Sequence, residues 1–461
     1  MTDKEIIEQL KKIVGEKNVQ ADKIGLTSYG YDATLLSGVG LAAVFPLSTE
    51  HVVKLVKLAN EAGFSLIPRG AGTNLSGGTI PDERSVTVNF NRMKKILDID
   101  TDNFVAVVEP GLVNFDLQAE LEKEGFYYPP DPASYKATTL GGNLGECSGG
   151  PRCFKYGVTR DYILGLEVVL PNGKVIQTGG RNFNSEPEYD LTRIIVGSEG
   201  TLALITKIFL RILPLPAAKK TMLAIYNRVE DASQTVSDIV AAGIVPTTLE
   251  MMDNLLINTA EDATGAGLPR DAGALLIIEI DGHPEDMDEQ VETIAGICKK
   301  ARVREFKIAR TAAEVDQLWL ARRVVIGSVA RRRPSYSLQD ITVPRSMFPN
   351  MVSGILQIAK ERNLEVGILA HAGDGNMHPL VLFDQRIEEE VERVHLAEKD
   401  ICTLALELGG TMSGEHGIGL LKKKYITLEF SPVAMDCFAK IKNSFDPRHL
   451  LNPGKIMNLQ S

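Results

Sequence analysis

Two glycine-dense stretches restrict this chain more than any other feature of its sequence. The first, residues 70–78 (GAGTNLSGG), follows a predicted strand at 64–67, and the second spans residues 139–150 (TLGGNLGECSGG). Glycine lets the backbone approach a ligand closely, and it lets consecutive N–H groups converge on an anion. Two such stretches suit a long ligand that has both a diphosphate and a ring to be held.

The first stretch taken alone is equally compatible with a mobile surface turn. It is not a Walker loop, because no Gly-Lys-Ser or Gly-Lys-Thr follows it. It is not the Rossmann fingerprint either, because Leu75 stands where the third glycine belongs. A third and shorter glycine segment lies at residues 197–201 (GSEGT).

The composition is that of a globular protein with a sizeable core. The chain has 461 residues, which predicts two or three domains, and 44% of them are apolar. Its formal net charge of −10 repels phosphate backbones, so we do not expect nucleic acid as a partner. No segment approaches the roughly 20 apolar residues of a membrane helix, and we expect neither a transmembrane segment nor a signal peptide.

The number and spacing of the cysteines indicate the redox compartment of the protein. Its five cysteines include no CxxC pair. This pattern is typical of the reducing cytoplasm, and it argues against an iron–sulfur cluster within this chain.

Hydrophobic periodicity divides the chain near residues 214–216. Before that point helices and strands alternate, with a helix at the N-terminus, a second one between Ser48 and Gly63, and strands at residues 64–67, 85–90 and 105–109. After it, strands are predicted at 221–226, 246–251, 272–281, 303–309, 364–371 and 378–383, and helices at 232–242, 285–301, 312–332 and 388–408. The second region therefore predicts an antiparallel sheet covered by helices on one side.

Histidine is rare in this chain and is concentrated near the C-terminal end of the second region. His371 and His378 flank an Asp-Gly turn, and His416 follows Glu415 between glycines. If the turn closes a hairpin, the two histidines meet across its mouth. Two neutral imidazoles and one carboxylate form a three-ligand metal set with open positions for a substrate. The alternative for any one histidine is a buried, hydrogen-bonded core residue.

The glycine stretches also carry a family resemblance. The segments PRGAGTNLSGG, GGNLGECSGGPRCFKYG, GLEVVLPNG and GSEGTLALIT follow one another in this order. Together they resemble the FAD-binding domain of the vanillyl-alcohol oxidase (PCMH-type) flavoproteins. Within that superfamily the chain, from about residue 20 onward, resembles the group formed by the FAD-linked glycolate oxidase subunits and the D-lactate dehydrogenases.

The resemblance implies an α+β fold of three parts. Residues 1–215 would form a PCMH-type FAD-binding domain of two α/β subdomains. Residues 216–410 would form a substrate (cap) domain with an antiparallel sheet covered by helices. Residues 411–461 would return to the FAD-binding domain.

The same resemblance assigns cofactor contacts. The diphosphate would be wrapped by the backbone of the first stretch, and the flavin, its ribityl chain and the adenine half by later residues. The implied contacts are Arg69, Gly70, Ala71, Gly72, Thr73, Asn74, Ser76, Pro132, Gly141, Gly142, Ser148, Gly149, Tyr156, Glu199, Gly200, Ile205 and Asn452. Some relatives tether FAD through a histidine in the first loop, which this chain lacks, so we expect non-covalent FAD. Cys147 and Cys153 are expected to be packing thiols rather than a thioether link.

In the catalytic region the resemblance implies that His371, His378 and Glu415 bind a divalent metal and that His416 is the base. Asp374 is a second choice as a ligand, and zinc, iron and manganese all suit the set. Arg322 matches the arginine that binds the substrate carboxylate, although without the resemblance a solvated helix arginine would be the simpler interpretation. Asn376 is expected to orient the ligands or the substrate.

These roles predict a flavoenzyme that oxidises a small D-2-hydroxy acid. A metal lowers the pKa of the substrate hydroxyl, a neutral histidine accepts its proton, and the flavin accepts the hydride. Relatives that bind larger dicarboxylates carry a lysine where this chain has Leu338. We therefore expect D-lactate first and glycolate next, with D-2-hydroxyglutarate as the alternative.

Two other functions remain open from the sequence. One is a non-catalytic flavin subunit of a larger oxidase, and the other is a flavin-free metallohydrolase. The expected electron acceptor is a partner protein, either an electron-transferring flavoprotein or an iron–sulfur subunit. A run of lysines at 422–424 could dock an acidic partner, but a solvated helix face is the simpler interpretation.

Overall fold

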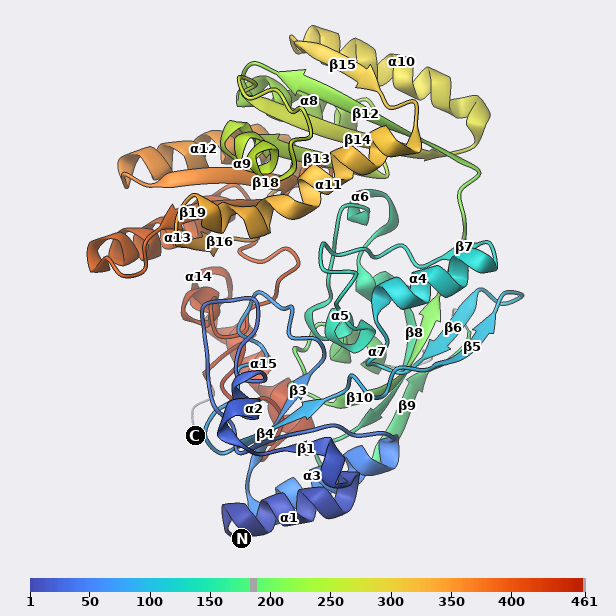
Figure 1. The fold of residues 1–461 in the computed structure, drawn as a ribbon, viewed down its shortest axis with the longest axis vertical. Coiled ribbons are helices and arrows are strands. Elements are labelled where there is room, and N and C mark those ends of the chain that lie inside the picture. The colour runs from blue at the N-terminus through green and yellow to red at the C-terminus, as the bar shows by residue number, and fades with distance from the viewer. Residues whose placement is uncertain (183–188, 459–461) are drawn as a thin grey trace. The chain divides into compact units, whose positions relative to one another are not determined.

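The computed structural model describes residues 1–182 and 189–458, and the chain divides into two compact units (Figure 1). The first unit contains Met1–Gly149, Val158–Leu215 and Glu415–Ser461. The second unit contains Pro216–Gly414 together with a short segment, Gly150–Gly157, taken from the middle of the first.

The first unit opens with a sheet in the order β1-β2-β4-β3. Its strands are β1 (Val19–Gln20), β2 (Ala42–Val44), β3 (Ser65–Arg69) and β4 (Ser85–Asn89), and the last three run parallel. Helices α1 (Asp3–Val14) and α3 (Thr49–Ala62) lie side by side and share one apolar core with these strands. Helix α3 is capped by Ser48 and ends at Gly63, as its sequence predicts.

A second sheet of the first unit is antiparallel, in the order β5-β6-β10-β8-β9. Its strands are β5 (Ile96–Asp100), β6 (Val105–Val108), β8 (Ile163–Val169), β9 (Val175–Gly179) and β10 (Leu204–Arg211), while β7 (Phe126–Tyr127) pairs with β11 (Leu213–Pro214). The other helices of the unit are α2 (Lys23–Thr27), α4 (Asn114–Lys123), α5 (Leu140–Glu146), α7 (Leu191–Ile195), α14 (Ile426–Glu429) and α15 (Pro432–Phe445), with 3-10 turns at Glu16–Asn18, Thr159–Tyr162 and Lys423–Tyr425.

The C-terminal segment closes the first sheet. Leu451 forms a parallel bridge with Leu66 of β3, and the Asn452 N–H donates to the Leu66 carbonyl at 2.9 Å. Close to this contact a buried ion pair joins Lys442 Nζ of α15 to Asp446 Oδ2 at 2.6 Å, and Lys442 Nζ also donates to the Leu451 carbonyl at 3.0 Å. The end of the chain therefore braces the strand from which the first glycine stretch emerges.

The second unit is built on one antiparallel sheet in the order β15-β12-β14-β13-β18-β19-β16, with β17 paired to β19. The strands are β12 (Ala218–Tyr226), β13 (Thr248–Asp253), β14 (Ala274–Gly282), β15 (Glu305–Ile308), β16 (Ser335–Leu338), β17 (Ile341–Thr342), β18 (Glu365–His371) and β19 (Asn376–Phe383). The helices are α6 (Cys153–Tyr156), α8 (Val229–Ala241), α9 (Asn254–Thr264), α10 (Pro284–Lys300), α11 (Ala312–Ser328), α12 (Phe348–Glu361) and α13 (Glu388–Glu407), with 3-10 turns at Val329–Arg331 and Arg345–Met347.

Helices cover both faces of this sheet, so the prediction of one covered face is wrong. Alternate residues of β12 enter different cores: Met222 packs with α8, α10, α12 and α13, whereas Leu223 packs with α9 and α11. Sequence periodicity missed α9 and α12, which left too few helices for a second layer. The predicted antiparallel sheet itself is confirmed.

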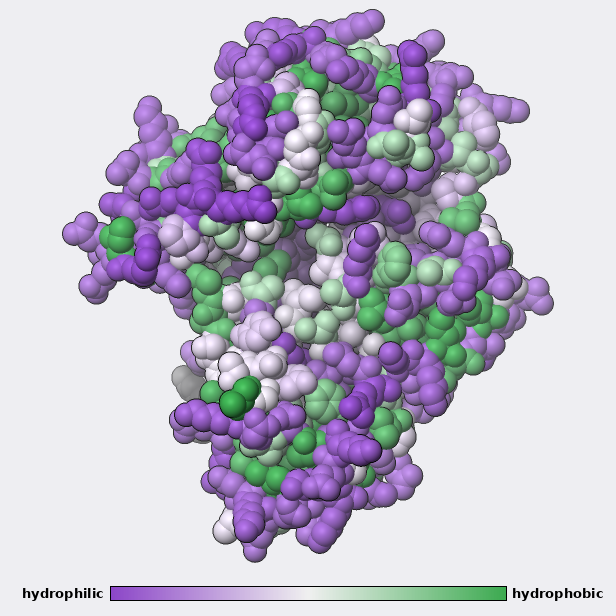
Figure 2. Space-filling view, in the orientation of Figure 1, coloured by the Kyte–Doolittle hydropathy of each residue, from purple (hydrophilic) through white to green (hydrophobic). Residues whose placement is uncertain are grey.

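The face drawn in Figure 2 is mostly hydrophilic, with apolar residues in small groups. Among the described residues, no helix combines the length and the apolar character needed to cross a bilayer.

Candidate active site

The first glycine stretch lies in the loop that leaves β3, and its conformation is fixed from several directions. Gly72 has a φ of +73°, and a Cβ atom built there would lie 2.1 Å from Arg69 Nη2. Arg69 is itself held, because its Nη1 donates to the Tyr31 carbonyl at 2.7 Å. Asn74 Nδ2 donates to Asp32 Oδ2 at 2.7 Å. The loop is close-packed, and a side chain at Gly72 would clash with its neighbours. A loop of this kind can offer backbone N–H groups to a phosphate ligand.

Glycine is unfavourable inside helices, yet most of the second glycine stretch forms helix α5. Thr139 caps the helix, because its hydroxyl accepts the Gly142 N–H at 3.3 Å. A Cβ on Gly141 would lie 2.7 Å from Pro110 Cβ. The glycines therefore allow the helix to approach the neighbouring backbone, and Ser148 and Gly149 follow directly after its C-terminal end.

Several of the expected cofactor residues from distant parts of the sequence meet in the first unit. Asn452 Nδ2 donates to the carbonyls of Gly78 and Glu199, at 2.9 and 2.7 Å. The Glu199 carboxylate accepts the backbone N–H groups of Ile418 and Gly419, at 2.7 and 2.8 Å. The first glycine stretch, the GSEGT segment and the C-terminus thus form one hydrogen-bonded cluster.

Glu146, which the sequence did not single out, lies beside this cluster. Its Oε1 accepts the Ser76 hydroxyl at 3.2 Å. Burial raises the pKa of Glu146 well above its usual range, and repulsion from Glu199 raises it further. The Glu146 carboxyl therefore belongs to the polar surroundings of the first glycine stretch.

The other expected cofactor residues are spread more widely. Pro132 is buried in the turn before α5, Gly200 follows Glu199, and Ile205 lies in β10. Tyr156 belongs to the second unit, where its hydroxyl donates to Asp281 Oδ2 at 2.9 Å.

In the second unit the predicted histidine hairpin is formed by β18 and β19. Residues 372–375 make the turn, and Gly375 adopts a φ of +85°. His371 pairs with Asn376 and His378 with Leu369, which places both imidazoles on the same face of the sheet. Their ring centroids are 5.1 Å apart, with the planes at 87°. Both side chains are buried.

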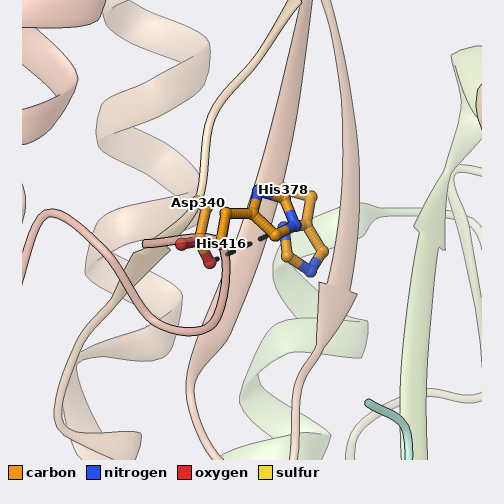
Figure 3. Close-up of side chains that lie close together, drawn as sticks. All are labelled: Asp340, His378 and His416. Carbon is orange, nitrogen blue, oxygen red and sulfur yellow. Dashed lines mark ion pairs between the residues drawn. The ribbon is translucent and has the colours of Figure 1, made fainter. Parts of the chain in front are cut away.

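Each histidine is oriented through Nδ1. His371 Nδ1 lies 2.6 Å from Glu250 Oε1, and His378 Nδ1 lies 3.4 Å from the Gln339 carbonyl. Figure 3 shows Asp340 next to His378, with Asp340 Oδ1 3.9 Å from His378 Nδ1. When an acceptor fixes Nδ1–H, the ring presents Nε2 to a metal, which is the usual arrangement at metal-binding histidines.

Arg322, on α11, contacts the same carboxylate as His371. Its Nε donates to Glu250 Oε2 at 2.5 Å, and both side chains are almost completely buried. Burial raises the pKa of Glu250, but Arg322 and His371 outweigh it, so the pKa lies below its usual value. Glu250 is therefore ionised and shared between a guanidinium and an imidazole.

Asn376 and Asp340 hold the loop that leads out of the second unit. Asn376 Nδ2 donates to Asp340 Oδ1 at 2.8 Å, and Asp340 Oδ2 accepts the Gly414 N–H at 2.9 Å. Asp374 accepts the Asn376 N–H at 3.1 Å, which is a local turn contact. Glu415 and His416 follow Gly414 directly in the chain.

Two polar residues of this region carry no predicted role from the sequence: Glu250 and Asp340. Glu250 lies within the segment TTLEMMD, and an ionised carboxylate in a buried strand requires a charged or hydrogen-bonding partner. The need for such a partner could have indicated a role for Glu250 from the sequence. The neighbouring residues do not show, however, that the partners are His371 and Arg322.

Comparison with known families matches two regions of the chain. The FAD binding domain family matches residues 41–179, and the family of FAD linked oxidases, C-terminal domain, matches residues 215–456. Solved structures agree at the level of the fold: p-cresol methylhydroxylase has a TM-score of 0.80 at 17% identity, covering 98% of this chain and 96% of that one. Alkyldihydroxyacetonephosphate synthase has a TM-score of 0.76 at 19% identity, covering 99% and 85%.

Sequence relatives extend over nearly the whole chain. Glycolate oxidase subunit GlcD of Bacillus subtilis is 43% identical over 99% of this chain and 97% of its own length. D-lactate dehydrogenase of Anaerostipes hadrus is 32% identical over 98% of this chain and 97% of its own length. Because the C-terminal family match covers more than half of the chain and the relatives cover nearly all of it, this protein belongs to the FAD-linked oxidases and binds FAD.

Proposed function

We propose that this protein oxidises a small D-2-hydroxy acid to the 2-oxo acid, D-lactate first and glycolate next. The observation that carries the proposal is the buried hairpin on which His371 and His378 lie on one face, in the same unit as a buried arginine. Two imidazoles for a metal and one guanidinium for a carboxylate are the groups that a 2-hydroxy acid requires.

The names of the relatives support the choice of substrate. One is named a glycolate oxidase subunit and another a D-lactate dehydrogenase, and both names refer to short hydroxy acids. Leu338 packs against the apolar core on the α11 side of the sheet. An apolar side chain at this position favours a short substrate over D-2-hydroxyglutarate, whose second carboxylate would need a cation.

The proposed metal ligands are His371, His378 and Glu415. The donor set fits zinc, iron or manganese, because both histidines are oriented through Nδ1 and a carboxylate completes the set. Glu415 directly follows Gly414, whose N–H is bonded to Asp340, and consecutive Cα atoms are only about 3.8 Å apart. The backbone of Glu415 therefore lies near Asp340, because Glu415 is covalently bonded to Gly414.

In the proposed reaction Arg322 binds the substrate carboxylate and His416 accepts the hydroxyl proton. Asn376 orients the substrate; its Oδ1 atom is buried and has no hydrogen-bond partner in the described part of the chain. A bound divalent metal would supply Lewis-acid activation of the hydroxyl, and bound FAD would supply the hydride acceptor. Glu250 and the Gln339 carbonyl hold the two histidines in orientation.

The electrons are proposed to pass to a partner protein in the cytoplasm, either an electron-transferring flavoprotein or an iron–sulfur subunit. The five cysteines all lie among the described residues and form no disulfide with one another, which supports a reducing compartment.

Anaerobic bleaching of the flavin tests the proposed function. We expect D-lactate or glycolate to bleach bound FAD, L-lactate and D-2-hydroxyglutarate to do so much more slowly, and prior chelation to abolish the reaction. Bleaching by D-2-hydroxyglutarate alone would reassign the substrate. Failure of every hydroxy acid would favour a non-catalytic flavin subunit, and a colourless, flavin-free protein would reopen the metallohydrolase alternative.

Replacing Gly72 by alanine is expected to weaken FAD binding at least tenfold. The new Cβ would require a left-handed backbone conformation and would displace the anchored Arg69 guanidinium, which distorts the loop. The FAD dissociation constant can be measured by flavin fluorescence. Gly63→Ala is a matched control, because Gly63 has a φ of +72° but no neighbouring atom within 4 Å. Equal effects of the two substitutions would contradict a role for the packed loop.

A further inference from the structure

We infer that Glu250 is a positioning residue that fixes a metal-binding histidine and the substrate-binding arginine relative to each other. The inference rests on the proposed function, because it takes His371 as a ligand and Arg322 as the carboxylate anchor. It adds a residue that the sequence did not indicate and a reason why binding of metal and binding of substrate should depend on one carboxylate.

Strand register places Glu250 beside His371. Residues of β13 and β18 pair so that Glu250 lies opposite His371, and directly opposed side chains of an antiparallel pair point to the same face. The neighbour of Glu250 on that face, Met252, belongs to the core that α11 covers. Arg322 extends from α11 onto this face, so helix and hairpin meet at the Glu250 side chain.

Each carboxylate oxygen of Glu250 contacts a nitrogen of one partner. Oε1 lies 2.6 Å from His371 Nδ1, and Oε2 lies 2.5 Å from Arg322 Nε. Only 1% of the Glu250 side chain is exposed, so water does not compete for these contacts. The bond to Arg322 uses Nε, one of five N–H donors, so the terminal nitrogens can form the fork that binds a substrate carboxylate.

The charge of Glu250 is as important as its geometry. If His371 held a divalent cation, that cation and the Arg322 guanidinium would be two positive groups on either side of the Glu250 carboxylate, because His371 and Arg322 both contact it directly. Without the carboxylate, the guanidinium and the metal would repel each other in a buried environment. With it, the histidine becomes a more basic ligand and the arginine is neutralised, so both cations are tolerated.

The test compares Glu250→Gln with Glu279→Gln in the full-length, FAD-loaded protein after removal of metal. Glu279 is a matched control: it is buried on the adjacent strand β14, and its Oε2 accepts the Thr221 hydroxyl at 2.8 Å. Binding of Co²⁺ is measured by titration and by the visible spectrum of the bound ion. The KM for the hydroxy acid that bleaches the flavin is measured at saturating Co²⁺.

For Glu250→Gln we expect the Co²⁺ dissociation constant to rise about 10- to 100-fold. We expect KM to rise about tenfold or more, with a smaller change in kcat, because the amide has one acceptor oxygen where the carboxylate has two, so its NH2 group would face one of the two donors. Glu279→Gln should match the parent protein in both quantities. If Glu250→Gln does not accumulate with FAD bound, Glu250→Asp should shift the same two quantities, since the shorter carboxylate cannot reach both partners.

The outcomes separate this inference from the proposed function. If the parent binds no Co²⁺, the proposed metal site fails and the inference fails with it. If the parent binds Co²⁺ and Glu250→Gln binds it equally well with an unchanged KM, the proposed function stands and the positioning role is overturned. Equal losses in Glu250→Gln and Glu279→Gln would indicate general damage to the core and would also overturn the role.

Discussion

Replacing His416 by alanine is expected to slow anaerobic flavin reduction by the hydroxy acid by a factor of about 10² to 10⁴, the usual contribution of a general base. The hydroxyl of a 2-hydroxy acid gives up its proton reluctantly, and hydride departure is favoured only once that proton has moved to an acceptor. The rate constant can be measured by stopped-flow bleaching at saturating substrate. Metal content should stay at the level of the parent protein, because His416 is not a proposed ligand.

His395 provides the control for this substitution. Its side chain is largely exposed on α13, and its Nδ1 lies 3.1 Å from the carboxylate of Glu398 on the same helix. His395→Ala should therefore bleach at the rate of the parent. If His416→Ala bleaches as fast as the parent, His416 is not the base; if it also loses metal, His416 would have to be reassigned as a ligand.

Replacing Asp446 by alanine is expected to lower the free energy of unfolding of the first unit by about 3–5 kcal/mol, the range for removing one partner of a buried ion pair. Asp446 is completely buried and accepts Lys442 Nζ at 2.6 Å. It also accepts the N–H groups of Leu450 and Leu451, at 2.9 and 2.8 Å. The substitution removes the carboxylate from the Lys442 ammonium and from two backbone donors, and it loosens the contact that braces β3.

The measurement is denaturant unfolding of the FAD-loaded protein, with flavin release recorded as a second signal. Asp436→Ala is a matched control on the same helix, because Asp436 pairs with Lys440 four residues away on the exposed face of α15. An exposed pair of this kind contributes about 0–1 kcal/mol. A loss below about 1 kcal/mol for Asp446→Ala would show that the buried pair does not hold the C-terminal segment in place.

Much of the local structure follows from the sequence alone. The end of α3 at Gly63 and the Asp-Gly hairpin both depend on residues within a few positions of one another. Such signals report local backbone preferences, and the structure confirms them. The order of the glycine-rich segments also identified the family, which the comparisons confirm.

Local signals were misleading where packing decided the outcome. The stretch at 139–150 is rich in glycines, which are unfavourable inside helices, yet the cap at Thr139 and close packing against Pro110 accompany helix α5 there. Helix α15 was not among the predicted helices, and the side chain that it buries is that of a charged residue, Lys442.

The sequence by itself determined the glycine stretches, the histidine hairpin and the caps, since each depends on neighbours along the chain. Only the tertiary structure decided which residues hold the site together. Glu250 is 121 positions from His371 and 72 from Arg322, and the register of β13 with β18 and the packing of α11 bring them together. Register depends on burial of entire strand faces, a long-range property that no local sequence pattern records.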